Sequence, residues 1–198
     1  MGLMFAFFAG LAAGLLHVFS GPDHLAAVAP LAADRTRAQW KTGLQWGIGH
    51  TAGVLLIASL LLIIREQLPL DAISAYSERI VGVALMLVGA WGVWKASRPG
   101  FTTNRHSHSG ASFAMGMLHG LAGSSHLFGV LPALAFATRA ESVLYLAGFG
   151  VGAVTAMSAF TAAVGLLNRM IPHRHSSGLL YASSAAALVI GGFWLVAR

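Results

Sequence analysis

The chain has 198 residues, of which 57% are hydrophobic and 9% are charged, whereas a soluble domain carries roughly a quarter charged residues. Its formal charge is +6, from 12 Lys and Arg against 6 Asp and Glu, and its mean hydropathy is +0.74. Because the basic residues fall in short clusters between long apolar runs, they are typical of membrane-flanking loops and argue against a nucleic-acid partner. Cysteine is absent, which excludes disulfides and thiolate metal sites.

Six apolar runs are long enough to cross a hydrocarbon core, which takes about 20 helical residues. They cover residues about 4–33, 43–64, 78–96, 113–137, 142–166 and 178–197. The first run is long enough to be tilted or broken. Five tryptophans lie near run ends, where interfacial aromatics are expected: Trp40, Trp46, Trp91, Trp94 and Trp194.

The loop charges predict an orientation. Loops on the N-terminal side carry four Lys or Arg residues and those on the opposite side carry eight. By the positive-inside rule we expect a multi-pass protein of the cell inner (plasma) membrane with both termini outside the cytoplasm.

Two copies of one unit make up the chain. Residues 14–33 and 116–135 align at an offset of 102 with nine identities in twenty positions. The identities include the pairs His17/His119, His24/His126 and Pro30/Pro132. Three spans per copy is an odd number, so the second copy enters the membrane from the opposite side. We therefore expect one all-α membrane domain over residues 1–198, with six helices in two inverted repeats (about 1–96 and 113–198) joined by a linker (about 97–112).

Ionisable groups inside membrane spans are costly and indicate a functional site. Away from the ends of the runs, the histidines and the one carboxylate are His17, Asp23, His24, His50, His119 and His126. Imidazole nitrogens with one carboxylate and no thiolate suit a borderline divalent metal ion. The alternative is that each histidine hydrogen-bonds a neighbouring helix. Two duplicated pairs beside a lone acid favour metal binding by these six residues, either to one ion or with His119 and His126 binding another.

Gly21 and Pro22 lie between His17 and His24. On an unbroken helix the two histidines would be about 10.5 Å apart along the axis, too far for one ion to bind both. Proline removes a backbone donor and clashes with the preceding turn, so we expect the helix to break there and to fold back toward His17. Gly123 marks the equivalent place in the second copy, so the first helix of each repeat is predicted to be broken.

Four more histidines form two His-x-His pairs in predicted cytoplasmic loops, His106/His108 and His173/His175. They would capture metal near the entrance to the site, or they are ordinary polar loop residues.

The stretch from His17 to Leu25, HVFSGPDHL, resembles the signature helix of the nickel/cobalt transporter superfamily, most closely its six-span branch of urease-accessory-type nickel permeases. The stretch from Gly47 to Thr51, GIGHT, is similar to that family's Gly-His-Ser/Thr motif. The resemblance implies a secondary transporter for Ni²⁺ or Co²⁺, with Zn²⁺ as a weaker candidate. The ion-binding set that it implies is His17, Asp23, His24 and His50.

The rival interpretation is a b-type haem membrane protein, in which paired histidines on facing helices ligate iron. It would need neither Asp23 nor a helix break. In the transporter interpretation we expect no prosthetic group and no enzymatic activity. The expected partners are the lipid bilayer, the divalent metal ion, and a metallochaperone or a second copy of the chain.

Overall fold

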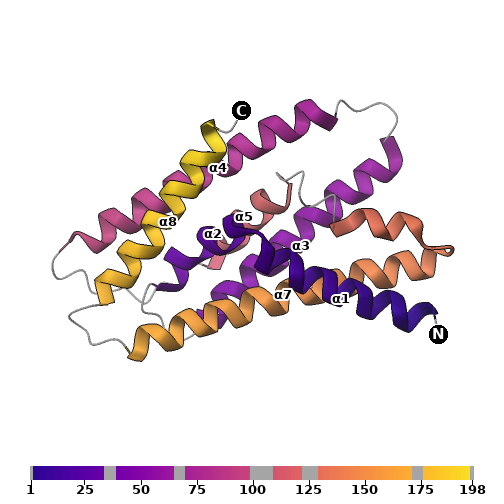
Figure 1. Cartoon of the computed structure of the whole chain (residues 1–198), viewed down its shortest axis with the longest axis horizontal. Coiled ribbons are helices and arrows are strands. Elements are labelled where there is room, and N and C mark those ends of the chain that lie inside the picture. The colour runs from indigo at the N-terminus through magenta and orange to yellow at the C-terminus, as the bar shows by residue number, and fades with distance from the viewer. Residues whose placement is uncertain are drawn as a thin grey trace.

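The computed structural model describes residues 2–33, 39–64, 70–98, 109–121, 129–170 and 176–196. All regular structure in these residues is helical, which confirms the predicted all-α class (Figure 1). The elements are α1 (Gly2–Ser20), α2 (Pro22–Ala33), α3 (Gln39–Ile64), α4 (Leu70–Ala96), α5 (Ser109–Leu121), the short 3₁₀ helix η1 (Leu131–Ala135), α7 (Arg139–Met170) and α8 (Ser176–Val196).

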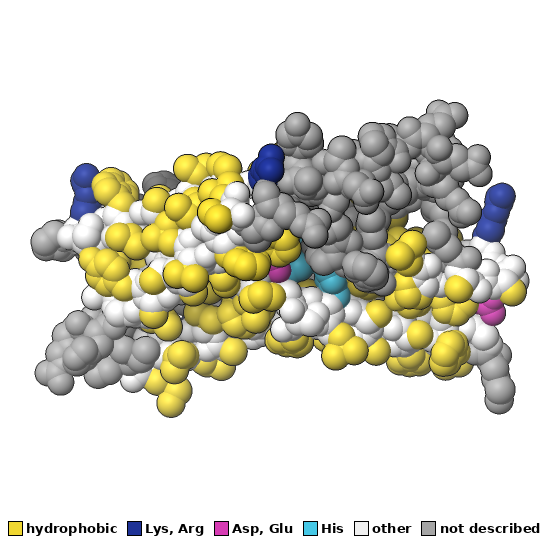
Figure 2. All heavy atoms as spheres, turned by 45° about the horizontal axis from the view of Figure 1, so that its top comes forward, with side chains coloured by type: hydrophobic (Ala, Val, Ile, Leu, Met, Phe, Trp, Pro, Cys, Tyr) yellow, Lys and Arg dark blue, Asp and Glu magenta, His cyan; other side chains and the backbone are white. Residues whose placement is uncertain are grey.

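Four stretches of the described helices are long and apolar enough to cross a membrane: Gly2–Ser20, Arg79–Ala96, Arg139–Met170 and Ser177–Val196. Large apolar side chains point outward from them, and Phe8, Val143 and Phe193 are each more than half exposed. Figure 2 shows a face on which hydrophobic side chains predominate. An exposed apolar surface of this extent fits a lipid environment. These apolar helices are those expected of a membrane protein.

Two of the predicted runs are not single helices. Residues 4–33 form two helices, since Gly21 separates α1 from α2. Within residues 113–137, α5 ends at Leu121, and the chain is described again from residue 129 into η1. The break predicted at Gly21 and Pro22 is therefore present in the first run.

Other helices extend beyond the predicted runs. The helix α4 begins at Leu70 instead of residue 78, and α7 covers Arg139–Met170 instead of 142–166. At the start of α7 the Glu141 N–H donates to Thr138 Oγ1 and the Thr138 N–H donates to the Glu141 carboxylate, both at 3.2 Å. This capping box satisfies two backbone donors, so the helix begins at its cap and not at the first apolar residue.

The helices assemble as pairs: α1 lies along α7, α5 along α3, and α4 along α8. The pairs are joined by contacts between α3 and α7, while α2 lies among α3, α4, α7 and α8. Figure 1 shows α4 and α8 on one side of the molecule and α1 and α7 on the other. The first turn of α2, which carries Asp23 and His24, therefore lies in the interior.

Glycines bring α1 and α7 into backbone contact. A methyl group on Gly10 would overlap the carbonyl oxygen of Tyr145, and one on Gly14 would overlap that of Phe149. Because the residue numbers rise together in the two helices, α1 and α7 run parallel.

The pair α3 and α5 is built in the same way. A methyl group on Gly116 would overlap the carbonyl oxygen of Trp46, and one on Gly120 would overlap that of His50. These two helices also run parallel. Small residues that permit close approach are the usual means of packing helices in membranes.

The pair α4 and α8 runs antiparallel. Gly82 faces Gly191 and Gly89 faces Ser184, so residue numbers rise in one helix as they fall in the other. The helices α3 and α7 are antiparallel as well, because Gly47 faces Val154 while Thr51 faces Gly150.

Candidate metal site

The site is built on the junction between α1 and α2. The Gly21 N–H still donates to the His17 carbonyl at 3.2 Å, as the last bond of α1, and the His24 N–H donates to the Gly21 carbonyl at 3.1 Å. Pro22 is the first residue of α2, a position where its missing N–H and fixed φ are tolerated. The interruption is therefore at Gly21 itself, and Asp23 lies in the first turn of the new helix.

Gly21 also makes room for the site. A methyl group there would overlap His24 Nδ1 and lie 3.0 Å from Asp23 Oδ1. Any larger residue at this position would displace the His24 ring.

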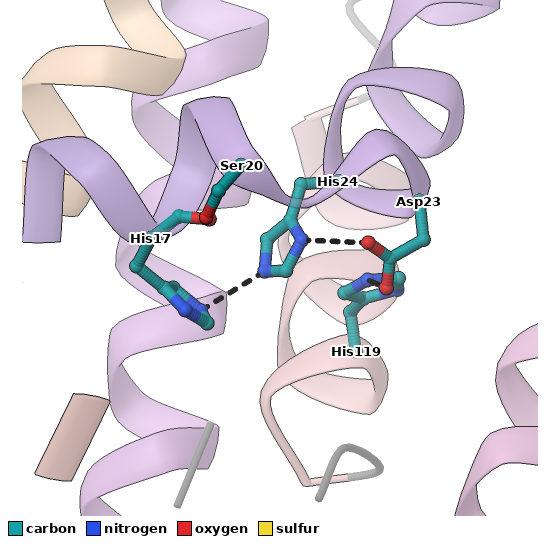
Figure 3. A network of polar contacts seen from close by, with 5 residues as sticks. All are labelled: His17, Ser20, Asp23, His24 and His119. Carbon is teal, nitrogen blue, oxygen red and sulfur yellow. Dashed lines mark hydrogen bonds and ion pairs between the residues drawn. The ribbon is translucent and has the colours of Figure 1, made fainter. Parts of the chain in front are cut away.

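Four polar side chains form a hydrogen-bonded row (Figure 3). His17 Nε2 is hydrogen-bonded to His24 Nε2 at 3.1 Å, and His24 Nδ1 to Asp23 Oδ1 at 3.0 Å. The second oxygen, Asp23 Oδ2, is hydrogen-bonded to His119 Nε2 at 3.0 Å. His24 and His119 thus share one carboxylate, although Asp23 and His119 are 96 positions apart in the sequence.

His50 joins this row from the middle of α3. Its ring is stacked on that of His17, with centroids 5.6 Å apart, and meets the His24 ring edge to face at 5.0 Å. On its other side Trp46 stacks at 4.9 Å with an angle of 15° between the planes. The His50 ring is thereby held between aromatic neighbours.

Two sets of three side chains bring possible ligand atoms within 4.8 Å of one another: His17, His24 and His50, and Asp23, His24 and His119. His24, His50 and His119 are each at most 2% exposed and Asp23 is 7% exposed, while His17 is partly buried. We call these five residues the histidine cluster. Figure 2 shows histidine and acidic side chains between apolar ones near the middle of one face.

The structure thus brings together five of the six residues predicted as metal ligands. His126 and Gly123 lie outside the described residues, as do the loop histidines His106, His108, His173 and His175.

Trp46 was not predicted as part of the site, and its prediction as an interfacial aromatic is wrong. Its side chain is fully buried and contacts the rings of His24, His50 and His119. The available signal was its spacing: residues four apart on a helix are neighbours on one face, which places Trp46 beside His50.

No family model matches the chain, and no solved structure matches it. The chain is similar to two chloroplast proteins. Chloroplast protein FOR GROWTH AND FERTILITY 2 of Arabidopsis thaliana is 36% identical over 201 residues, covering 92% of this chain and 54% of that protein. Chloroplast protein FOR GROWTH AND FERTILITY 1 of the same plant is 34% identical over 207 residues, covering 92% and 56%. The chain spans about half the length of these curated relatives.

These comparisons contradict the resemblance to the nickel/cobalt transporter superfamily. The curated relatives are named as chloroplast growth and fertility proteins, not as nickel or cobalt permeases, and no family model for that superfamily matches. The interpretation as a Ni²⁺ or Co²⁺ permease is therefore wrong, and the relatives lend no support to a plasma-membrane location. The resemblance was specific only at HVFSGPDHL and GIGHT, and two motifs this short do not specify a family.

The ring contacts lend no support to the haem alternative. Its paired ligands would have to stand on opposite sides of a porphyrin ring. Here the His17 and His24 rings are in contact, with centroids 4.6 Å apart and their Nε2 atoms hydrogen-bonded. The His24 and His119 rings are also in contact, at 4.7 Å.

Proposed function

We propose that this chain is an integral membrane protein whose histidine cluster binds a divalent transition-metal ion. The observation that carries the proposal is the convergence of His17, His24 and His50 with Asp23 hydrogen-bonded to the far nitrogen of His24. A metal-bound histidine usually donates its second ring N–H to a carboxylate, which fixes the tautomer and strengthens the ligand. Asp23 is placed to accept the second ring N–H of His24.

The ligand chemistry supports a borderline ion such as Zn²⁺. Three imidazoles leave a fourth tetrahedral position open, as in zinc sites that exchange a ligand. His17 also lies in the last turn of α1, where the carbonyl ends of the helix favour a cation. The junction between two half-helices of a broken membrane helix is a usual place for an ion site.

We also propose that the chain forms two inverted repeats of three spans. With the offset of 102, Gly82 is equivalent to Ser184, and Gly191 is equivalent to Gly89. Gly82 faces Gly191 and Gly89 faces Ser184, so the contacts between α4 and α8 follow the symmetry of the repeat. Equivalent helices related by an axis in the membrane plane are antiparallel, and α4 runs antiparallel to α8 as α3 does to α7. An axis along the membrane normal would make them parallel.

This topology predicts which side each loop faces. The chain has no cysteine, so Ser97→Cys, Ala137→Cys and Ser177→Cys each carry a single thiol, and all three positions are exposed. We expect Ser97→Cys and Ser177→Cys to react with a membrane-impermeant maleimide from one side of sealed vesicles and Ala137→Cys from the other. Labelling of positions 97 and 137 from the same side would contradict six spans.

The metal proposal is tested by removing His24, which belongs to both sets of ligands. The starting protein carries alanine at His106, His108, His173 and His175 and a purification tag without histidine. We expect it to bind Zn²⁺ in detergent and to gain about 2.7 kcal/mol of stability at 100 times Kd. His24→Ala should bind no Zn²⁺ and gain no stability.

Ser184→Ala is the matched control, because Ser184 is fully buried in α8 and outside both sets of ligands. It should bind Zn²⁺ like the starting protein. Unchanged binding in His24→Ala would show that the ion lies elsewhere.

A further inference from the structure

We infer that the histidine cluster offers two overlapping positions for the ion, which share His24 and are occupied one at a time. The inference rests on the proposed function. Position one is formed by His17, His24 and His50, and position two by Asp23, His24 and His119.

His24 lies at the centre of the row and uses its two nitrogens in different directions (Figure 3). Its Nε2 meets His17 at 3.1 Å, and its Nδ1 meets Asp23 at 3.0 Å. Position one therefore draws on Nε2 and position two on Nδ1.

A neutral imidazole has one nitrogen with a free lone pair and one N–H. With an ion in position one, Nε2 is the ligand and the Nδ1–H donates to Asp23. With an ion in position two, Nδ1 is the ligand and the Nε2–H donates to His17. Both states carry one proton on His24, so no proton is gained or lost between them.

Two ions at once would require His24 to lose its remaining proton. They would also place two divalent charges on either side of one ring, where their repulsion is large in a medium of low dielectric. The structure therefore favours one ion per chain.

The two positions differ in surroundings. Position one has three neutral ligands, and its His17 is partly exposed. Position two includes the carboxylate of Asp23, and each of its ligands is at most 7% exposed. An ion in position two therefore has a negative ligand that an ion in position one lacks.

The position of the ion is read from Zn²⁺ X-ray absorption of the protein that lacks the loop histidines. His50→Ala removes a ligand of position one, so we expect zinc bound by two imidazoles and a carboxylate. His119→Ala removes a ligand of position two, so we expect zinc bound by three imidazoles. Because the other position remains, each single change should weaken binding by less than about tenfold, or 1.4 kcal/mol. The double variant should lose binding.

The possible outcomes separate this inference from the proposed function. One Zn²⁺ per chain with the two distinct spectra supports both. If His50→Ala abolishes binding while His119→Ala leaves affinity and spectrum unchanged, there is a single position and the inference is wrong, although the proposed function stands. Two Zn²⁺ per chain would also overturn the inference. If Zn²⁺ does not bind the unaltered cluster, the proposed function itself fails. Ser184→Ala, measured in parallel, should match the starting protein.

Discussion

Replacing Asp23 with asparagine is expected to lower the affinity for Zn²⁺ by about 10- to 100-fold, because position two loses its carboxylate and position one loses the charged outer-shell partner of His24. Asp23 contacts two histidines at once, His24 and His119, both at 3.0 Å. It is also the one acidic member of the histidine cluster. The change therefore removes the negative charge as well as one acceptor.

The fold should survive this substitution, because asparagine has the shape of aspartate. Its amide oxygen can accept an N–H from one ring, and its NH₂ group can donate to the other after a change of tautomer. The affinity is measured by competition with a chelator, and folding by thermal unfolding without metal.

The matched control is Glu141→Gln, which makes the same acid-to-amide change at the start of α7 and keeps the capping box. It should bind Zn²⁺ like the unaltered protein. An affinity unaffected by Asp23→Asn would remove Asp23 from the site.

Replacing Gly14 with alanine is expected to destabilise the protein by about 1–3 kcal/mol, the usual cost of overpacking. The added methyl group would overlap the carbonyl oxygen of Phe149 and lie 2.9 Å from the backbone nitrogen of Ala153. Both are backbone atoms, so α1 and α7 would have to move apart along their length. The effect is measured as the midpoint of thermal or denaturant unfolding in detergent.

Gly192→Ala in α8 is the control, because a methyl group there meets no atom within 4 Å among the described residues. Alanine is a better helix former by about 1 kcal/mol, so this variant should be as stable as the unaltered protein or more so. Gly116→Ala, the equivalent of Gly14 in the second copy, should be destabilised like Gly14→Ala. Equal stability of the Gly14 and Gly192 variants would contradict close packing of α1 on α7.

The parts of the site that lie close in sequence could be predicted from the residues. Proline after glycine in an apolar run indicates an interruption, and an interruption brings residues seven positions apart into contact. That reasoning is local, because it needs only the geometry of one helix and its break.

The parts that depend on packing could not be predicted. The repeat grouped His119 with Asp23 and His24 as ligands, but the sharing of one carboxylate by His24 and His119 depends on how α5 packs against α2. Helices that are apolar all around give no periodic signal of which face meets which neighbour. The start of α7 is a different case, because Thr138 and Glu141 have the spacing of a capping box and could have been recognised.

The glycine contacts have a mechanical consequence. At these glycines the backbone of α1 contacts that of α7, and the backbone of α3 contacts that of α5. We therefore expect each pair of helices to move as one rigid unit. His17 belongs to the pair α1 and α7, whereas His50 and His119 belong to the pair α3 and α5. An ion held between His17 and His50 would therefore connect the two helix pairs at the point where α1 ends.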